Sequence, residues 1–283
     1  MTQTGLIYDV GAHNGDDTAW YLQQGYRVVA VEANPLLVKE LEKKFSPAIE
    51  TGKLKVVNVA VTEKDGETIP FFISRDDWRS STQKKIAERE ADIVQTVQLP
   101  TATLAALFQQ YGCPQYCKID IEGNDAVAIN SLKGTAQKPQ YISCEISCHS
   151  IAEVQQNEAL LYETLNALQQ AGYKFFQLMD QDSLLQLSDN IHYSRQHTFS
   201  ARLRTKWERI TGRYTARHSN RYLVAKNRKT TIDYVTTPFG EALTGNWTDV
   251  AATRALVQLH FNDYYKNTQN KELIFWVDIH ARL

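Results

Sequence analysis

The sequence predicts an α/β fold with a mostly parallel, seven-stranded sheet and helices on both faces. Strand-like apolar runs alternate with helix-like segments through the first two-thirds of the chain, which is typical of parallel sheets. A turn from Gly11 to Gly15 follows the first run, and an acid, Glu32, follows the second. This order of strand, glycine turn, helix, strand and acid is how Rossmann-like proteins hold an adenosine.

The expected elements follow from runs of apolar residues and from apolar positions repeated at helical spacing. Strands are expected at residues 5–11, 27–33, 54–61, 116–122, 140–147 and 173–180, with a final strand at 221–225. Helices are expected between them at 18–24, 36–44, 103–111, 125–132 and 154–171. Two further strands, 68–74 and 93–99, flank a polar loop that contains Ser80 and Ser81.

Length and composition indicate a globular protein with a sizeable core. The chain has 283 residues, of which 43% are hydrophobic and 22% charged, and these are ordinary globular values. We divide it into a Rossmann-like core at 1–190, a basic insertion at 191–220, and a last core strand with a C-terminal extension at 221–283. The four cysteines are expected to be reduced core residues. No leader or membrane span is read from the sequence, so we expect a cytoplasmic protein.

The charge is distributed unevenly. Residues 195–229 carry eleven Lys and Arg against one acid, while the rest of the chain is acidic. Within this segment, residues 199–214 read as a basic amphipathic helix that would pack on the core, cover a substrate site, or contact a membrane surface. Such asymmetry indicates an anionic partner. We expect no nucleic acid, because the excess of basic residues lies on this one insertion while the rest of the chain is acidic.

The glycine turn distinguishes between cofactors. It reads Gly-x-x-x-Gly and follows Asp9, whereas dinucleotide enzymes use G-x-G-x-x-G to bind a pyrophosphate at a helix N-terminus. A carboxylate there would repel a pyrophosphate, but it suits the cationic methionine end of S-adenosylmethionine. A tight structural turn is the alternative interpretation of this motif.

Acidic residues close most of the expected strands. Ligands of open α/β sheets bind beyond the carboxyl ends of the strands, and four of the five ends carry a carboxylate. The ends are Asp9, Glu32, Asn58-Val59-Ala60, Asp120-Ile121-Glu122-Gly123 and Glu145. Helix capping explains Asn34 or Asn124 but not the whole set.

Taken together, these motifs resemble the FkbM family of S-adenosylmethionine-dependent methyltransferases. The resemblance spans about the first 150 residues, with a weaker likeness in the tail. Its motifs are 9–15, 31–35, 58–60 with 65–66, 80–81, 118–123 and 144–146, and in the tail 238–240, 245–247 and 276–280. One departure is Leu104-Ala105-Ala106-Leu107-Phe108, where the family often has an acidic helix start.

The resemblance implies a methyltransferase that moves the methyl group of S-adenosylmethionine onto an oxygen, often a sugar hydroxyl. It implies cofactor contacts by Asp9, Gly11 and Gly15 on the methionine side and by Glu32 at the ribose. Asn58, Val59 and Ala60 would flank the adenine, and Asp120 the sulfonium. We add His13, Asn14, Thr18 and Ala33 as expected cofactor contacts.

A hydroxyl is a poor nucleophile, so a nearby base is expected. His149 is the first candidate, followed by Glu122 and Glu145. A metal held by Asp120, Glu145 and His149 is the alternative way to activate the hydroxyl, but we assign none. Ser80, Ser81, Arg202 and Arg209 are the expected contacts to an anionic sugar or glycan acceptor.

The rival interpretations of the sequence are a nicotinamide-dependent oxidoreductase and a non-catalytic module that docks on a glycan or membrane.

Overall fold

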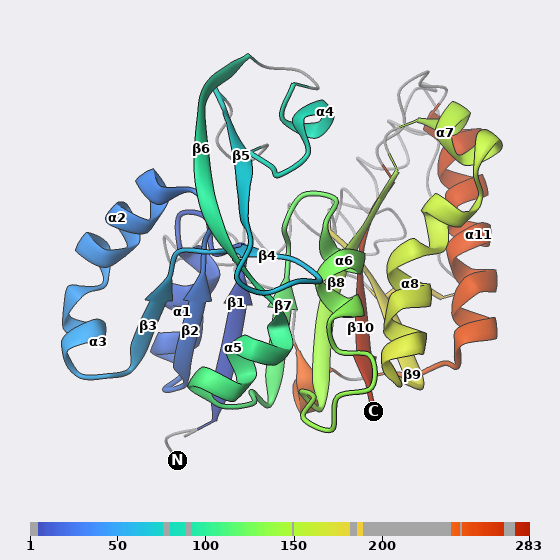
Figure 1. Cartoon of the computed structure of the whole chain (residues 1–283). Coiled ribbons are helices and arrows are strands. Elements are labelled where there is room, and N and C mark those ends of the chain that lie inside the picture. Colours follow the sequence, from blue (N-terminus) through green and yellow to red (C-terminus); the bar gives the residue numbers. More distant parts are fainter. Residues whose placement is uncertain are drawn as a thin grey trace, which may run out of the picture.

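A computed structural model of the chain has a seven-stranded sheet in which one strand is antiparallel (Figure 1). It describes residues 5–75, 80–88, 92–148, 150–181, 186–188, 239–243, 245–268 and 275–283. The strand order is β3 (Leu54–Val57), β2 (Arg27–Val31), β1 (Leu6–Val10), β7 (Tyr116–Ile119), β8 (Tyr141–Cys148), β10 (Phe275–Arg282) and β9 (Phe175–Asp180). β10 runs antiparallel to both of its neighbours. The predicted mostly parallel α/β sheet is confirmed.

Among the described residues, the strand between β8 and β9 is β10, at a stretch where the sequence predicted no strand. Along β10, Phe275, Val277, Ile279 and Ala281 are fully buried in the core, and the residues between them face the other side of the sheet, as strand geometry requires. Residues 221–225 and the insertion at 191–220 lie outside the described residues, so their interpretation stays a prediction.

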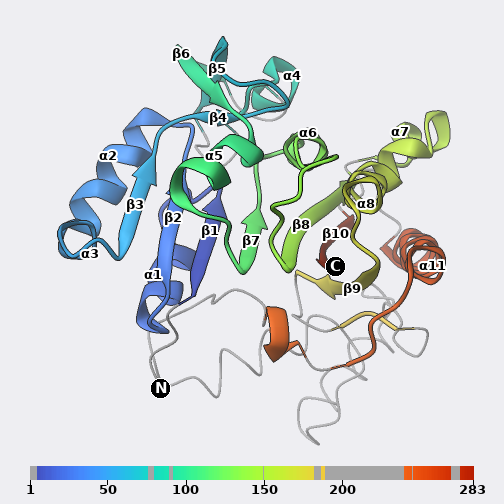
Figure 2. The same ribbon diagram turned by 60° about the horizontal axis from the view of Figure 1, so that its bottom comes forward.

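Helices cover both faces of the sheet (Figure 2). One face packs on α1 (Asp16–Gln23) and α2 (Pro35–Lys44), and α3 (Ser46–Glu50) adjoins it. The other packs on α5 (Leu104–Tyr111), α6 (Asp125–Asn130), α8 (Ala159–Ala171) and α11 (Val250–Thr268). As expected, Asn34 caps α2, because its side chain accepts a 3.0 Å hydrogen bond from the Leu36 N–H. Among the helices of the described ranges, none is long and apolar enough to cross a bilayer.

Several expected boundaries were wrong. The strand at 116–122 ends at Ile119, and the strand at 54–61 is split into β3 and β4 (Ala60–Val61). The helix at 154–171 is also two helices, α7 (Ile151–Gln156) and α8. The break occurs because the Asn157 side chain accepts a 3.1 Å hydrogen bond from the Ala159 N–H, which begins a new helix. α3 and α11 were not expected.

A second, three-stranded sheet projects beyond the carboxyl ends of the main parallel strands (Figure 1). It consists of β4, β6 (Ile93–Ala102) and β5 (Thr68–Ser74), and β5 and β6 are antiparallel. The short helix α4 (Lys84–Ala87) accompanies them. The two expected strands at 68–74 and 93–99 are therefore confirmed, and they bring the Ser80-Ser81 loop to the end of the sheet where ligands bind in such folds.

An aromatic cluster fixes Phe239, which lies just after the undescribed residues 189–238, against the core. Its ring stacks on Tyr116 of β7 with a centroid distance of 4.2 Å and an interplanar angle of 10°. It meets Trp20 and Tyr21 of α1 edge to face at 5.7 and 5.4 Å. Phe239 is 7% exposed, so its burial joins the later part of the chain to the sheet.

We predict that Phe239→Ala lowers the free energy of unfolding by about 3–5 kcal/mol, because it leaves a cavity among aromatic rings. Urea denaturation measures this change. Tyr265→Ala is the control, since Tyr265 is 47% exposed on α11, and its cost should stay below about 1 kcal/mol. Equal effects of the two substitutions would contradict the anchoring role of Phe239.

Candidate functional site

The loop from β1 to α1 packs against the ends of neighbouring strands. Gly11 has a φ of 89°, and a Cβ at this position would lie 1.8 Å from the carbonyl oxygen of Asp120. The N–H of Gly11 donates a 2.8 Å hydrogen bond to the carbonyl oxygen of Val31, the last residue of β2. Gly15 has a φ of 77°, and its Cβ would lie 2.6 Å from carbons of Leu41 and Phe45. Packing requires both glycines, whatever they contact in a ligand.

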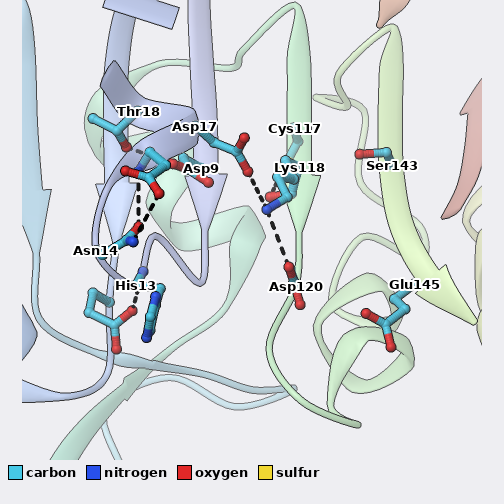
Figure 3. Close-up of polar contacts among 12 residues, drawn as sticks. Asp9, His13, Asn14, Asp17, Thr18, Cys117, Lys118, Asp120, Ser143 and Glu145 are labelled. Atoms are coloured by element: carbon cyan, nitrogen blue, oxygen red, sulfur yellow. Dashed lines mark hydrogen bonds and ion pairs between the residues drawn. The ribbon is translucent and has the colours of Figure 1, made fainter. Parts of the chain in front are cut away.

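Asp9 lies beneath this loop and is fully buried (Figure 3). Its Oδ2 accepts a 2.6 Å hydrogen bond from the hydroxyl of Thr18 in α1, whereas no described residue donates to its Oδ1. Burial raises the pKa of Asp9 to about 7, although the ammonium of Lys118 opposes this shift. Asp9 and Thr18, both expected at the cofactor, therefore lie together under the loop.

Glu32 clamps the loop to the end of β2. Its two carboxylate oxygens accept hydrogen bonds from the backbone N–H groups of His13, at 2.8 Å, and Asn34, at 2.7 Å. Glu32 is 7% exposed, and burial raises its pKa while these amides lower it. Because each carboxylate oxygen can accept a second hydrogen bond, the group retains capacity for a diol.

The rest of the expected cofactor set lies around this clamp. His13 has a φ of 47°, which places it in the left-handed region, and Asn14 is exposed and hydrogen-bonds Asp16. The Asn58 amide donates to the carbonyls of Glu32 and Ala33 at 2.9 Å each. Val59 is partly buried and Ala60 is buried at the start of β4. The ends of β1, β2 and β3 thus form one continuous surface.

A lysine joins this surface to β7. The Lys118 ammonium lies 2.5 Å from a carboxylate oxygen of Asp17 in α1 and 3.2 Å from one of Asp120 (Figure 3). Burial lowers the pKa of Lys118, but the carboxylates of Asp17, Asp120 and Asp9 outweigh it and raise the pKa well above its usual value. Lys118 therefore stays charged, and it orients Asp120.

Four carboxylates gather at the ends of β7 and β8. Burial raises the pKa of Glu145 well above its usual value, and the neighbouring Asp120, Asp125 and Glu122 raise it further. The indole N–H of Trp276 donates to Glu145 at 2.6 Å and acts in the opposite direction. Burial likewise raises the pKa of Asp125, together with Asp120. This end of the site favours cations and protonated carboxyl groups.

The segment that carries Ser80 and Ser81 covers the loop after β7. Ser81 donates to the carbonyl of Glu122 at 3.4 Å, and the backbone N–H of Ser74 donates to the Ser80 hydroxyl at 3.1 Å. Glu122 has a φ of 46°, and Gly123 has a φ of 78° close to the side chain of Ile86. Both serines therefore lie near the cluster, although their hydroxyls also hold the protein together.

Three predicted site residues, His149, Arg202 and Arg209, lie outside the described residues, so their roles stay predictions. Among the residues that are described, no group of three or more His, Cys, Asp and Glu side chains is arranged to hold a metal ion. Five residues lie at the site but were not among the predicted site residues: Asp17, Lys118, Asp125, Trp276 and Asp278. Asp278 lies opposite Glu145 in the pairing of β10 with β8, and burial raises its pKa to about 7. The sequence did offer a signal for this strand, because apolar residues alternate with Trp276, Asp278 and His280 from Phe275 to Ala281.

A comparison with protein families gives one match. The model described as the methyltransferase FkbM domain matches residues 9–175, which include the end of β1 and the whole of β2, β3, β7 and β8. No curated protein matches the sequence.

Solved structures give more distant likenesses. A SAM-dependent methyltransferase from Thiobacillus denitrificans in complex with S-adenosylhomocysteine has 12% identity and a TM-score of 0.37, over 99% of this chain and 86% of that one. A TehB-like SAM-dependent methyltransferase from Corynebacterium glutamicum has 10% identity and a TM-score of 0.35, over 67% and 76%. These low scores carry no argument about the site.

We predict that Gly11→Ala destabilises the protein more than Gly66→Ala does. Both residues have positive φ, 89° and 73°, but a Cβ at Gly66 would meet nothing within 4 Å. Gly66→Ala should therefore cost only backbone strain, about 1–2 kcal/mol, while Gly11→Ala adds a collision with the backbone at Asp120 worth about 1–3 kcal/mol. Urea unfolding compares the two. Equal costs would mean that Gly11 is not in tight contact with the backbone at Asp120.

We predict that Asp9→Asn becomes more stable relative to the wild type as pH rises. The pKa of Asp9 is about 7 in the folded chain and 3.8 when unperturbed, so between these values the unfolded state loses the proton first and wild-type stability falls. The stability difference should grow by roughly 2–4 kcal/mol between pH 4 and pH 8. Urea unfolding across this range measures it. Asp92→Asn, at a side chain 85% exposed, is the control, and a flat difference for Asp9→Asn would contradict the shift.

Proposed function

The chain belongs to the FkbM family of S-adenosylmethionine-dependent methyltransferases, whose domain model matches more than half of it, and from this premise we propose that it methylates a hydroxyl of a sugar, glycan or related metabolite. Glu145 is the proposed base. The single observation that supports it is a partly buried carboxyl group that the Trp276 indole N–H holds at 2.6 Å, among three other acids at the ends of β7 and β8, and whose pKa is raised well above its usual value. A base of raised pKa suits proton removal from a hydroxyl near neutral pH.

The residues present fit S-adenosylmethionine by their chemistry. The cofactor supplies an electrophilic methyl group on a positively charged sulfur. Glu32 keeps hydrogen-bonding capacity for a ribose diol beside the loop it clamps. Asp120, which Lys118 orients at 3.2 Å, adds negative charge at the point where a sulfonium would be favoured. The clustered ends of β1, β2 and β3 would hold the nucleoside.

The protein's part in the reaction is to orient and to accept a proton. Holding an acceptor oxygen in line with the methyl group contributes up to about 7–11 kcal/mol to such a displacement. Glu145 would accept the hydroxyl proton and become a neutral carboxyl, a form that its partly buried, acidic surroundings favour. Glu122 is the second candidate base, and His149 stays a third by prediction.

We also propose that the acceptor carries an anionic group, such as a phosphate or carboxylate. The support is the excess of Lys and Arg at 195–229, since arginine binds such groups through paired hydrogen bonds. The reacting end is itself acidic, so the anionic part of the acceptor would lie away from Glu145. Contact of residues 199–214 with a membrane surface is the alternative use of the same charge.

The rival functions are less well supported. Membership of a methyltransferase family leaves no support for a nicotinamide-dependent oxidoreductase. A purely docking module would have no use for a cluster of carboxyl groups around Glu145. Bringing like charges together is costly, and a catalytic role explains the arrangement.

We predict that calorimetry will detect binding of S-adenosylmethionine and S-adenosylhomocysteine but not of NAD. Glu32→Gln should weaken the binding of both sulfur ligands by about 10- to 100-fold. The side-chain NH₂ of glutamine would face one of the two backbone N–H groups that Glu32 accepts from, so one hydrogen bond of the loop would be lost. Glu145→Gln should bind both ligands normally. In transfer assays with labelled methyl groups on neutral and anionic sugars, it should be about 10²- to 10⁴-fold slower than the wild type.

The two arms test separate claims. Well-folded protein that binds neither sulfur ligand would contradict the cofactor assignment. Label found on nitrogen or carbon rather than on a hydroxyl oxygen would contradict the proposed reaction. Equal transfer to neutral and anionic sugars would contradict the anionic acceptor alone.

A further inference from the structure

A strand outside the family match reaches the proposed base. The FkbM domain model ends at residue 175, whereas β10 begins at Phe275 and lies between β8 and β9. The register pairs Asp278 with Glu145 and Trp276 with Ser147. Alternate residues share one face of a sheet, so Trp276 and Asp278 lie on the same face as Glu145. β10 therefore forms one side of the surroundings of Glu145.

The contact between Trp276 and Glu145 is directional. The indole Nε1 of Trp276 lies 2.6 Å from Oε2 of Glu145, and an indole N–H can only donate. It therefore favours the ionised carboxylate and holds one of its two oxygens. The Trp276 side chain is 38% exposed, so core packing does not account for the presence of a large aromatic residue here.

We propose that Trp276 is a positioning residue, whose N–H holds Oε2 of Glu145 and leaves Oε1 to accept the acceptor's proton. This inference rests on the proposed function, because it takes Glu145 as the base. The proton moves from the acceptor hydroxyl to Oε1 while the hydroxyl oxygen forms its bond to the methyl carbon. The methyl–sulfur bond breaks, and its electron pair stays on the sulfur.

Two substitutions separate the N–H from the ring. Trp276→Phe keeps an aromatic ring and removes the donor. Trp276→Gln removes the ring but keeps an N–H three bonds beyond Cβ, as in tryptophan. Trp247→Phe is the matched control, because Trp247 stacks with Arg282 at the opposite end of β10, 4.7 Å from the guanidinium carbon to the ring centroid.

The first readout needs no acceptor. The titration of Glu145 is followed by ¹³C NMR of protein labelled at the glutamate side-chain carboxyl carbons, with its signal assigned by its loss in Glu145→Gln. We expect Trp276→Phe to raise the Glu145 midpoint by roughly half to one pH unit. Trp276→Gln should recover most of this shift, and Trp247→Phe should leave the midpoint unchanged.

The second readout is methyl transfer to the best hydroxyl acceptor of the sugar panel. For Trp276→Phe, the acidic limb of kcat/KM should move to higher pH by the same amount as the NMR midpoint. An unchanged midpoint in Trp276→Phe overturns the inference and leaves the proposed function standing. A shifted midpoint with full turnover by Glu145→Gln overturns both, because Glu145 is then not the base.

Discussion

The ammonium of Lys118 is the positive charge around which the site is arranged. It contacts Asp17 at 2.5 Å and Asp120 at 3.2 Å, and it opposes the shift in the pKa of Asp9. In the strand register it lies between Asp9 of β1 and Ser143 of β8. Without it, three neighbouring carboxylates would repel one another. Losing one partner of such a partly buried group costs about 3–5 kcal/mol, so Lys118 couples the stability of the sheet to the placement of Asp120.

The site carries more negative charge than the ammonium of Lys118 neutralises. Asp120, Glu122 and Asp125 all raise the pKa of Glu145. A unit charge about 4 Å from another interacts with about 4 kcal/mol at the effective dielectric of a protein surface, so this field distinguishes a cationic ligand from a neutral one. S-adenosylmethionine carries a positive charge on its sulfur and loses it in the transfer. The same field would therefore favour the reactant over its neutral product.

The sequence predicted the parts of the molecule that depend on local pattern. The glycine turn, the main strands in their order along the chain, and the two strands that flank the Ser80-Ser81 loop all follow from residues near one another in the sequence. The two interpretations of the glycine turn are compatible, since Gly11 and Gly15 fit tight packing and still line the loop. Helix boundaries such as the break at Asn157 depend on single side-chain hydrogen bonds, which periodicity does not reveal.

The missed site residues share a different cause. Lys118 and Asp17 are 101 positions apart, and Trp276 and Glu145 are 131 apart, so strand order brings them together and no local motif records them. β10 is the clearest example. An antiparallel strand from the end of the chain lies between two earlier strands, so its outward side chains come to lie beside the end of β8. In this fold the C-terminal strand both completes the core and supplies polar groups at the end of β8, so the strand beyond the family match contributes to the site's chemistry as well as to its stability.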